Sequence, residues 1–187
     1  MYSYRTKTYI AGDWDGDSDA IGQLYYWKEN NYYSFDFVDV HSFMQSSDSS
    51  LPCSIKKSLR ERLNITKCFV LVVGSHTDTV TKGSCQFCKN YDSRDWLRLY
   101  GLNQCSSHGN VDYRSFIRFE CETALKDYNA GDLKKIVILY NSTYVDKAKC
   151  PDCLKNVHGI AHIPMKGRNY LGQIVWDYQS IKSAITC

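Results

Sequence analysis

The chain has 187 residues, of which 43% are hydrophobic and 23% charged, and this balance fits one ordered domain better than a disordered chain. A formal net charge of +3, without any run of Lys or Arg, does not predict binding to nucleic acid or to an anionic membrane. The first residues lack the apolar core of a secretory signal, and no apolar run approaches the roughly 20 residues that span a bilayer, so we expect a cytoplasmic protein.

Short apolar runs alternate with stretches of helical spacing along the chain. The expected strands are 7–13, 33–41, 67–75, 134–141 and the weaker 159–165. The first leads into an acidic loop, and acids interrupt the second. The third and fourth are apolar on both faces, as central parallel strands are. Helices are expected between and after them, over 20–31, 48–66, about 113–129 and 170–185.

This alternation predicts an α/β fold with a parallel sheet covered by helices on both faces. The expected architecture is a flavodoxin-like three-layer sandwich with five parallel strands in the order 2-1-3-4-5. Ligands of such sheets bind beyond the carboxyl ends of the strands. Residues 78–111 are too long for an ordinary connection, so we interpret them as an insertion within a single domain, 1–187, with a short helix at 92–101.

The stretch YRSFIRFECETAL, residues 113–125, has helical spacing but carries a carboxylate at the edge of its apolar face. Successive helical residues are rotated by about 100°, so Glu122 points away while Glu120 lies on the flank, one turn after Phe116. A glutamate in this position is most often solvated or paired with a neighbouring base such as Arg118. A functional role for Glu120 therefore needs support beyond its place on the helix.

The loop GDWDGDSD, residues 12–19, brings several acids to the end of the first strand. It is not an EF-hand, which would need Gly where Ser18 stands and an acid where Leu24 stands. Asp13 and Asp15 would permit the Mg²⁺ site of a receiver domain, but no phosphoacceptor Asp follows the third strand. Helix capping and compensation of the helix dipole are the other interpretation of these acids.

Nine cysteines in a reducing compartment indicate free thiols or a metal site rather than disulfides. Paired ligands two residues apart suit a structural Zn²⁺ ion, and the first candidate set is Cys85, Cys88, Cys105 and His108. A rival set keeps the first two ligands and adds Cys150 and Cys153. Ordinary buried thiols are the alternative to either set, and no Cys/His/Asn arrangement predicts a cysteine nucleophile.

Several stretches, in this order, resemble the TIR-like family of bacteria and archaea, in the branch that includes the ThsB-type proteins of Thoeris antiphage defence. They are RTKTYIAGDWDGD (5–17), SFDFVDVHSF (34–43), IKKSLRERLNITKCFVLVVGSHT (55–77) and YRSFIRFECETAL (113–125). The resemblance covers most of residues 5–145, and the remainder of the chain matches only in general pattern.

The resemblance implies a flavodoxin-like domain with NAD as its substrate. Glu120 matches the glutamate that stabilises the departure of nicotinamide, and Phe116 matches an aromatic position four residues earlier. By the same resemblance, the NAD cleft would be lined by Gly12, Asp13, Trp14 and Phe43, the last within a mobile loop at 41–50.

This chemistry is physically reasonable for one carboxylate. Loss of nicotinamide develops oxocarbenium character at the anomeric carbon, which a carboxylate in a partly dry cleft stabilises. Water or a ribose hydroxyl then captures the cation, giving hydrolysis or cyclisation to an ADP-ribose signal. The alternative is a non-catalytic TIR-like module that acts by self-association or by docking to a downstream effector protein.

Overall fold

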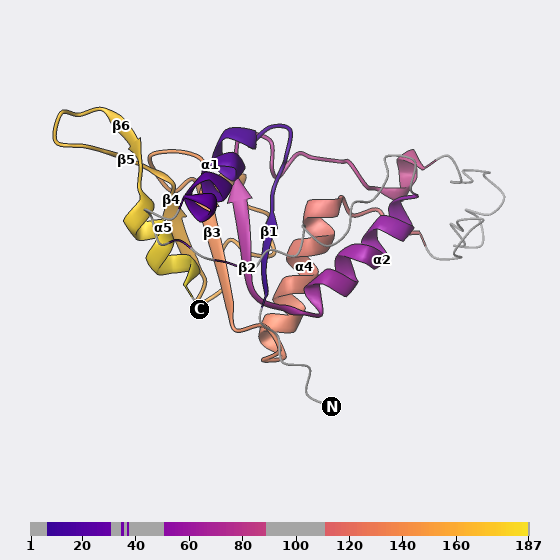
Figure 1. The fold of residues 1–187 in the computed structure, drawn as a ribbon. Helices are drawn as coiled ribbons and strands as arrows, with labels where there is room; N and C mark the ends of the chain where they lie inside the picture. Colours follow the sequence, from indigo (N-terminus) through magenta and orange to yellow (C-terminus); the bar gives the residue numbers. More distant parts are fainter. Residues whose placement is uncertain (1–6, 31–34, 36, 38–50, 89–110, 187) are drawn as a thin grey trace.

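Four parallel strands form the central sheet of the computed structural model, which describes residues 7–30, 35, 37, 51–88 and 111–186 (Figure 1). The strands are hydrogen-bonded in the order β1-β2-β3-β4, and their register aligns Ile10, Val70, Val137 and Ala161 across the sheet. Their bounds are β1 Lys7–Ala11, β2 Thr66–Val73, β3 Lys135–Tyr140 and β4 Ala161–Pro164. The carboxyl ends of these parallel strands therefore lie at the same edge of the sheet.

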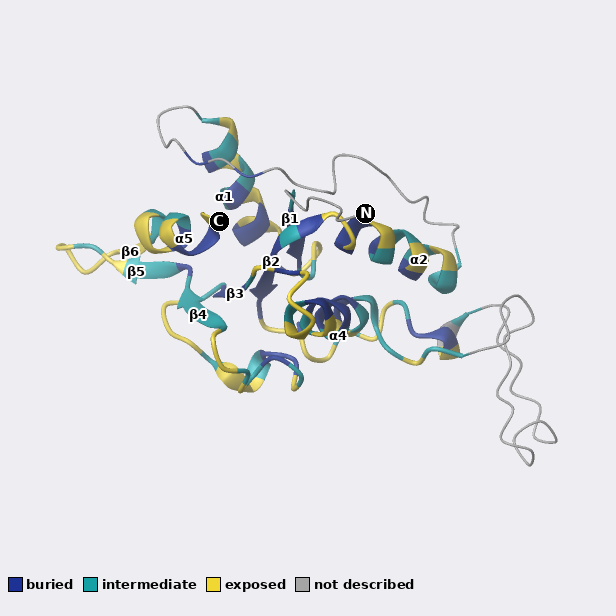
Figure 2. Ribbon diagram, turned by 90° about the horizontal axis from the view of Figure 1, so that it is seen from below, coloured by how far each residue is buried: buried dark blue, intermediate teal, exposed yellow. Residues whose placement is uncertain are grey.

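Helices cover both faces of the sheet because neighbouring side chains of a strand point to opposite faces. Tyr9 belongs to the apolar cluster of one face and Ile10 to that of the other. The face of Tyr9 is covered by α2 (Pro52–Leu63) and α4 (Phe116–Asn129), and the face of Ile10 by α1 (Ser18–Glu29) and α5 (Tyr178–Ile185) (Figure 1). Figure 2 shows that the strands and the inward faces of these helices are the buried parts of the molecule.

Local sequence explains where the helices begin. The Ser115 hydroxyl accepts a hydrogen bond from the Arg118 N–H at 3.2 Å and caps α4. The Asp177 carboxylate accepts from the Ser180 N–H at 3.1 Å and caps α5, whereas α2 begins at Pro52, which has no N–H to leave unpaired. Among the residues that the structure describes, no helix is both long and apolar enough to cross a membrane.

The expected α/β class and the parallel sheet with helices on both faces are confirmed. Four of the five expected strands appear, in an order that agrees with a flavodoxin-like sheet. Most of the remaining strand, 33–41, lies outside the described residues, as does the expected short helix at 92–101. Phe35 and Phe37 are described from that stretch, and both are buried in the cluster beneath α1.

The prediction of one long helix over 170–185 is wrong in its first half. The chain instead forms an antiparallel hairpin from β5 (Lys166–Arg168) and β6 (Ile174–Trp176), and the helix begins only at Tyr178. The Asn169 side chain accepts hydrogen bonds from the N–H groups of Leu171 and Gln173, and Gly172 has φ +77°. This turn chemistry overrides the helical spacing, because Asn and Gly stabilise tight turns.

Hydrogen bonds join the two described ends of the insertion to each other and to α2. The Cys85 N–H, at the start of the 3-10 helix η3 (Cys85–Phe87), donates to the Asp112 carbonyl at 3.0 Å. The buried Lys56 ammonium donates to the same carbonyl at 3.1 Å and to that of Arg114 at 2.6 Å. These bonds fix the chain just before α4 and so fix where α4 begins.

Candidate functional site

Gly12 and Trp14 lie where the fold predicts a ligand edge, directly after β1. A Cβ atom at Gly12 would lie 3.2 Å from the Val72 Cβ, so this position is tightly packed against the neighbouring strand. Asp13 accepts a backbone hydrogen bond from the Asp17 N–H at 2.7 Å, which closes the loop. Trp14 is 43% exposed, so its indole is accessible at the carboxyl edge of the sheet.

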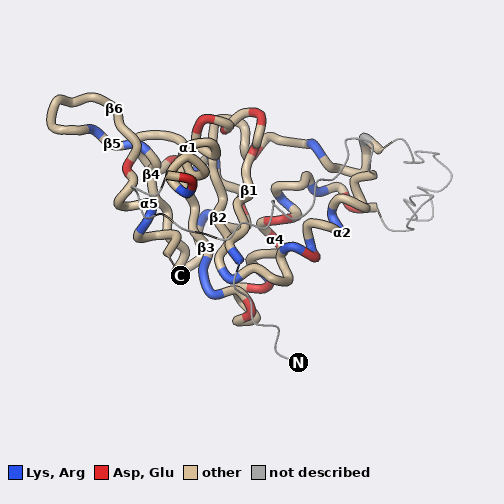
Figure 3. Tube along the Cα trace, in the orientation of Figure 1, with Lys and Arg blue, Asp and Glu red and all other residues tan. Residues whose placement is uncertain are grey.

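A buried carboxylate that the sequence analysis did not single out, Asp17, organises this loop. Its side chain is 2% exposed and accepts a hydrogen bond from Asn141 Nδ2 at 3.1 Å, across the end of β3. Asn141 Nδ2 also lies 2.8 Å from an oxygen of Asp19, which pairs with Lys166 at 3.3 Å. Burial raises the pKa of Asp17, which the Asn141 hydrogen bond partly offsets. Acidic residues gather in this loop between β1 and α1 (Figure 3).

The Asp17 carboxylate packs directly against the backbone of Gly74, just after β2. A Cβ atom at Gly74 would lie 1.8 Å from Asp17 Oδ1, so any larger residue there would have to displace the Asp17 carboxylate. Asp17 is the residue before α1, yet its side chain makes no capping hydrogen bond. Its role is to join the ends of three strands rather than to cap the helix.

Glu120 lies in the second turn of α4 and is buried, with an exposed fraction of 6%. The hydroxyl of Tyr9, on β1, donates a short hydrogen bond to Glu120 Oε1. Burial raises the pKa of Glu120 to about 7, although the Tyr9 hydrogen bond and the charge of Arg62, on α2, oppose the rise. Glu120 is therefore a desolvated carboxyl that titrates near neutral pH, unlike a solvated surface glutamate.

Arg118, the neighbouring base that could pair with a surface glutamate at this position, does not pair with Glu120. Arg118 pairs instead with Glu122, with Nε 3.0 Å from Oε1, and Arg114 pairs with the other oxygen of Glu122 at 2.9 Å. Burial opposes the ionisation of Glu122, but these two guanidinium groups lower its pKa. The two glutamates of this helix thus have opposite environments.

Phe116, one turn before Glu120, packs against the loop that follows β2 and against the core beneath α4. A Cβ atom at Gly83 would lie 2.4 Å from Cδ1 of the Phe116 ring, and Gly83 has φ +97°. Glycine is needed there both for the backbone conformation and for the ring. The aromatic residue predicted to accompany Glu120 is thus held in place by the loop after β2.

The predicted NAD-contacting residues lie on both sides of the sheet. The Trp14 ring centroid is 6.1 Å from that of Tyr25, which packs in the cluster beneath α1. Glu120, through Tyr9, lies on the face covered by α2 and α4. A ligand that touches Trp14 and Glu120 must therefore cross the sheet edge at Gly12. Phe43 lies outside the described residues.

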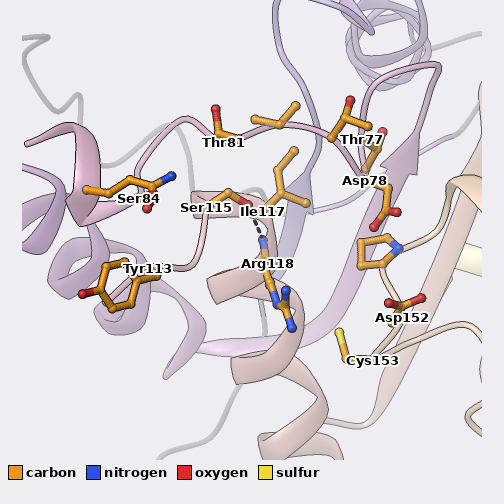
Figure 4. Close-up of a pocket in the computed structure, with 14 residues that line it drawn as sticks. Thr77, Asp78, Thr81, Ser84, Tyr113, Ser115, Ile117, Arg118, Asp152 and Cys153 are labelled. Atoms are coloured by element: carbon orange, nitrogen blue, oxygen red, sulfur yellow. Dashed lines mark hydrogen bonds between the residues drawn. The ribbon is translucent and has the colours of Figure 1, made fainter. Parts of the chain in front are cut away.

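A cavity of about 220 Å³ opens at the N-terminus of α4, between the loop after β2 and the loop between β3 and β4 (Figure 4). Its walls are mainly hydroxyl and charged side chains, including Asp78, Ser84, Ser115, Arg118 and Asp152. Glu120 and Phe116 are not among the lining residues, so this cavity is separate from the predicted catalytic position.

The structure does not assemble the rival set of zinc ligands. The Cys85 N–H donates to the Asp112 carbonyl, which also binds Lys56 near the start of α2. Cys150 and Cys153 instead lie close enough to Cys121, in the middle of α4, to raise the pKa of its thiol. Among the residues that the structure describes, no three His, Cys, Asp or Glu side chains gather as metal ligands. Cys105 and His108 lie outside those residues, so zinc binding by the first set stays a prediction.

The thiols of the loop between β3 and β4 are protonated at neutral pH. Burial raises the pKa of both Cys150 and Cys153 to about 11, and that of Cys121 is raised well above its ordinary value. Cys121 and Cys150 are buried and Cys153 is half-buried, so desolvation favours the uncharged thiol at each of them when no cation is bound.

With the fold and these positions established, comparison with known families finds a match in the first part of the chain. Residues 2–82 match the family model of the Thoeris protein ThsB, TIR-like domain. The match confirms the resemblance drawn from the sequence and supports a TIR-like role in signalling or defence. It spans β1, α1, α2 and β2 and ends before α4, so Glu120 lies beyond the part of the chain that matches the ThsB family. A search of curated proteins found no match.

Sequence reasoning missed Asp17, Asn141 and Gly74, which together join the strand ends. A signal for Asn141 was present, because a polar residue directly follows the apolar run of 134–141 and so stands at the ligand edge. The hydrogen bond between Asn141 and Asp17 joins residues 124 positions apart in the chain, and no local pattern predicts such a pair.

Proposed function

We propose that the protein is a TIR-like signalling or antiphage-defence domain that binds NAD and breaks its nicotinamide N-glycosidic bond, with Glu120 as the catalytic carboxylate. The observation that carries this proposal is the environment of Glu120, a buried carboxyl with a pKa of about 7 beside Tyr9. Titratable groups with strongly shifted pKa values are concentrated at functional sites. The ThsB family match adds that residues 2–82, which contain β1, α1, α2 and β2, are similar to a TIR-like domain.

The chemistry requires the ionised form of Glu120. As the bond to the positively charged nicotinamide ring breaks, positive charge builds on the ribose ring, and a carboxylate in a low-dielectric site stabilises it. Attack by water on the anomeric carbon completes hydrolysis, and attack by a ribose hydroxyl completes cyclisation. Both outcomes use the same carboxylate, so the identity of the product is a separate question from the role of Glu120.

NAD must also reach Glu120, which is 6% exposed. Tyr9, its hydrogen-bond donor, lies three residues before Gly12, at the start of the loop in which NAD is expected to bind. For the carboxylate to contact NAD, the ligand must replace the Tyr9 hydroxyl as the partner of Glu120. The ligand must compensate the ionised carboxylate for the lost donor, and the positively charged nicotinamide ring and the ribose hydroxyls supply that compensation.

The test is release of nicotinamide from NAD by the full-length protein, beside Glu120→Gln and Glu122→Gln. Glu122 is the matched control, because it lies two residues away on the same helix but pairs with Arg114 and Arg118 on the outer side. We expect release by the wild type and by Glu122→Gln and none by Glu120→Gln. Equal release by all three proteins would disprove the role of Glu120.

A non-catalytic TIR-like interaction module is the second candidate, and the C-terminal hairpin favours it. The hairpin of β5 and β6 extends from the body of the domain (Figure 1), and its apolar residues are exposed, with Tyr170 at 94% and Leu171 at 65%. Such residues are typical of surfaces that contact another protein. Here the partner would be a second copy or a downstream effector. An interaction module would keep its full signalling output in Glu120→Gln, whereas an enzyme would lose it.

A further inference from the structure

The cavity at the N-terminus of α4 is separate from Glu120 and has its own set of polar groups. At about 220 Å³ it is smaller than the roughly 300–1,000 Å³ of pockets that hold drug-sized ligands, so it suits one small ring. Figure 4 shows Asp78, Asp152 and Cys153 on one side, Ile117 and Arg118 in the middle, and Ser84 and Tyr113 on the opposite side. Three separate segments of the chain therefore build its walls.

One backbone donor of α4 is left for a ligand in this cavity. The first N–H groups of a helix have no acceptor within the helix. The Phe116 N–H donates to the Lys82 carbonyl at 2.9 Å, and the Arg118 N–H donates to the Ser115 hydroxyl at 3.2 Å. The Ile117 N–H stands between them, and Ile117 lines the cavity. Within the described part of the chain, the hydrogen bonds of the first turn thus leave the Ile117 N–H open.

A buried hydroxyl in the cavity wall also lacks a partner. Ser84 is 2% exposed, and its Oγ makes no hydrogen bond within the part of the chain that the structure describes. Buried hydroxyl groups are nearly always hydrogen-bonded, so an unpaired one indicates a partner that the protein itself does not supply. Ser84 lies in the loop after β2, independently of the helix, and is a second observation that points to a ligand.

The charges around the cavity favour a neutral group over an anionic one in contact with its lining. Arg118 is the cation of the lining, and Glu122 already pairs with it at 3.0 Å. Two carboxylates, Asp78 and Asp152, also line the cavity, and Lys155 pairs with Asp152 at 2.6 Å. A phosphate at the helix terminus would meet the second carboxylate, Asp78, without a compensating cation in the lining. Carboxylates instead accept hydrogen bonds from sugar hydroxyls, as acidic residues do from ribose in dinucleotide sites.

We propose that this cavity binds a sugar through its vicinal hydroxyl groups. The Asp78 and Asp152 carboxylates accept from the diol, and the Ser84 hydroxyl and the Ile117 N–H bind the ring and exocyclic oxygens. The sugar is either free or part of a nucleotide, and both sources share this chemistry. The site does not depend on the proposed cleavage of NAD, because it excludes Glu120 and its test measures binding.

The test follows the backbone N–H signals of Ile117 and Arg118 by NMR during titration of the full-length protein with D-ribose, 2-deoxy-D-ribose and ADP-ribose. D-Ribose should shift both signals, and 2-deoxy-D-ribose should bind about tenfold more weakly, because it leaves a carboxylate without its donor. Tighter binding of ADP-ribose than of D-ribose would assign the site to a nucleotide-linked sugar, and equal binding to a free sugar. Both results support the proposal.

Three variants complete the test. Ser84→Ala and Asp78→Asn should each weaken D-ribose binding about fivefold to tenfold and leave the protein folded, since neither removes a hydrogen bond within the described structure. Glu61→Gln, an exposed acid on α2 outside the cavity, is the control and should bind as the wild type does. The proposal is overturned if D-ribose shifts neither signal, if 2-deoxy-D-ribose binds equally well, or if Asp78→Asn binds like Glu61→Gln.

Discussion

Replacement of Glu120 by Gln should stabilise the protein in a pH-dependent manner. Burial raises the pKa of Glu120 from 4.5 to about 7 in the folded state. Between these values the unfolded chain releases the proton and the folded protein keeps it, so stability from this group is full below about pH 4.5 and is lost as the pH rises through 7. At about 1.4 kcal/mol per pKa unit, the loss amounts to about 3 kcal/mol above pH 8.

Glutamine has the shape of the protonated acid and cannot ionise, so the variant escapes this loss. The difference in unfolding free energy between Glu120→Gln and the wild type should therefore grow by about 2–3 kcal/mol in favour of the variant between pH 5 and pH 8. Urea unfolding at both pH values measures it, and the comparison cancels the titration of every other group. A difference that stays constant with pH would refute the assignment of a neutral-range pKa to Glu120.

Two other substitutions test the packing that positions the site. Gly74→Ala should destabilise the protein by about 2–4 kcal/mol, because the new methyl group would meet the Asp17 carboxylate at 1.8 Å. Its control, Gly22→Ala on α1, has open space around it and should be neutral or stabilise by up to about 1 kcal/mol. Thermal unfolding distinguishes them. Lys56→Met should destabilise by about 2–3 kcal/mol in urea unfolding, because it leaves the Arg114 carbonyl without its donor and the partly buried Asp112 carboxylate without its Lys56 ion pair. The exposed Lys57→Met should change stability by less than about 0.5 kcal/mol. Equal effects within either pair would contradict the contacts described.

Periodicity alone predicted the sheet and the glutamate helix well, because both are dictated by burial. The run at 67–75 is apolar on both faces and became β2, Thr66–Val73, and the helix expected over about 113–129 became α4, Phe116–Asn129. The stretch 170–177 misled the same reasoning. Its apolar residues are exposed in a hairpin, and the turn at Asn169 and Gly172 decides its structure.

The site was harder to predict because it depends on contacts between distant segments. The place of Glu120 on its helix was correct in the sequence analysis, but its burial against Tyr9 joins residues 111 positions apart. Cysteine spacing likewise suggested the rival set Cys85, Cys88, Cys150 and Cys153, which does not gather as metal ligands in the described part of the chain, since spacing constrains each pair and not the distance between pairs. Local patterns therefore identified the candidate residues, and tertiary packing decided which of them meet.

The measurement that tests the central claim most directly is the initial rate of nicotinamide release from NAD at pH 6 and pH 8. If ionised Glu120 is the catalytic group, the wild-type rate should rise about tenfold between these values, following the carboxylate fraction of a group with a pKa of about 7, and Glu120→Gln should release none at either pH. Release by Glu120→Gln at the wild-type rate, or no release by the wild type at either pH, would contradict the account.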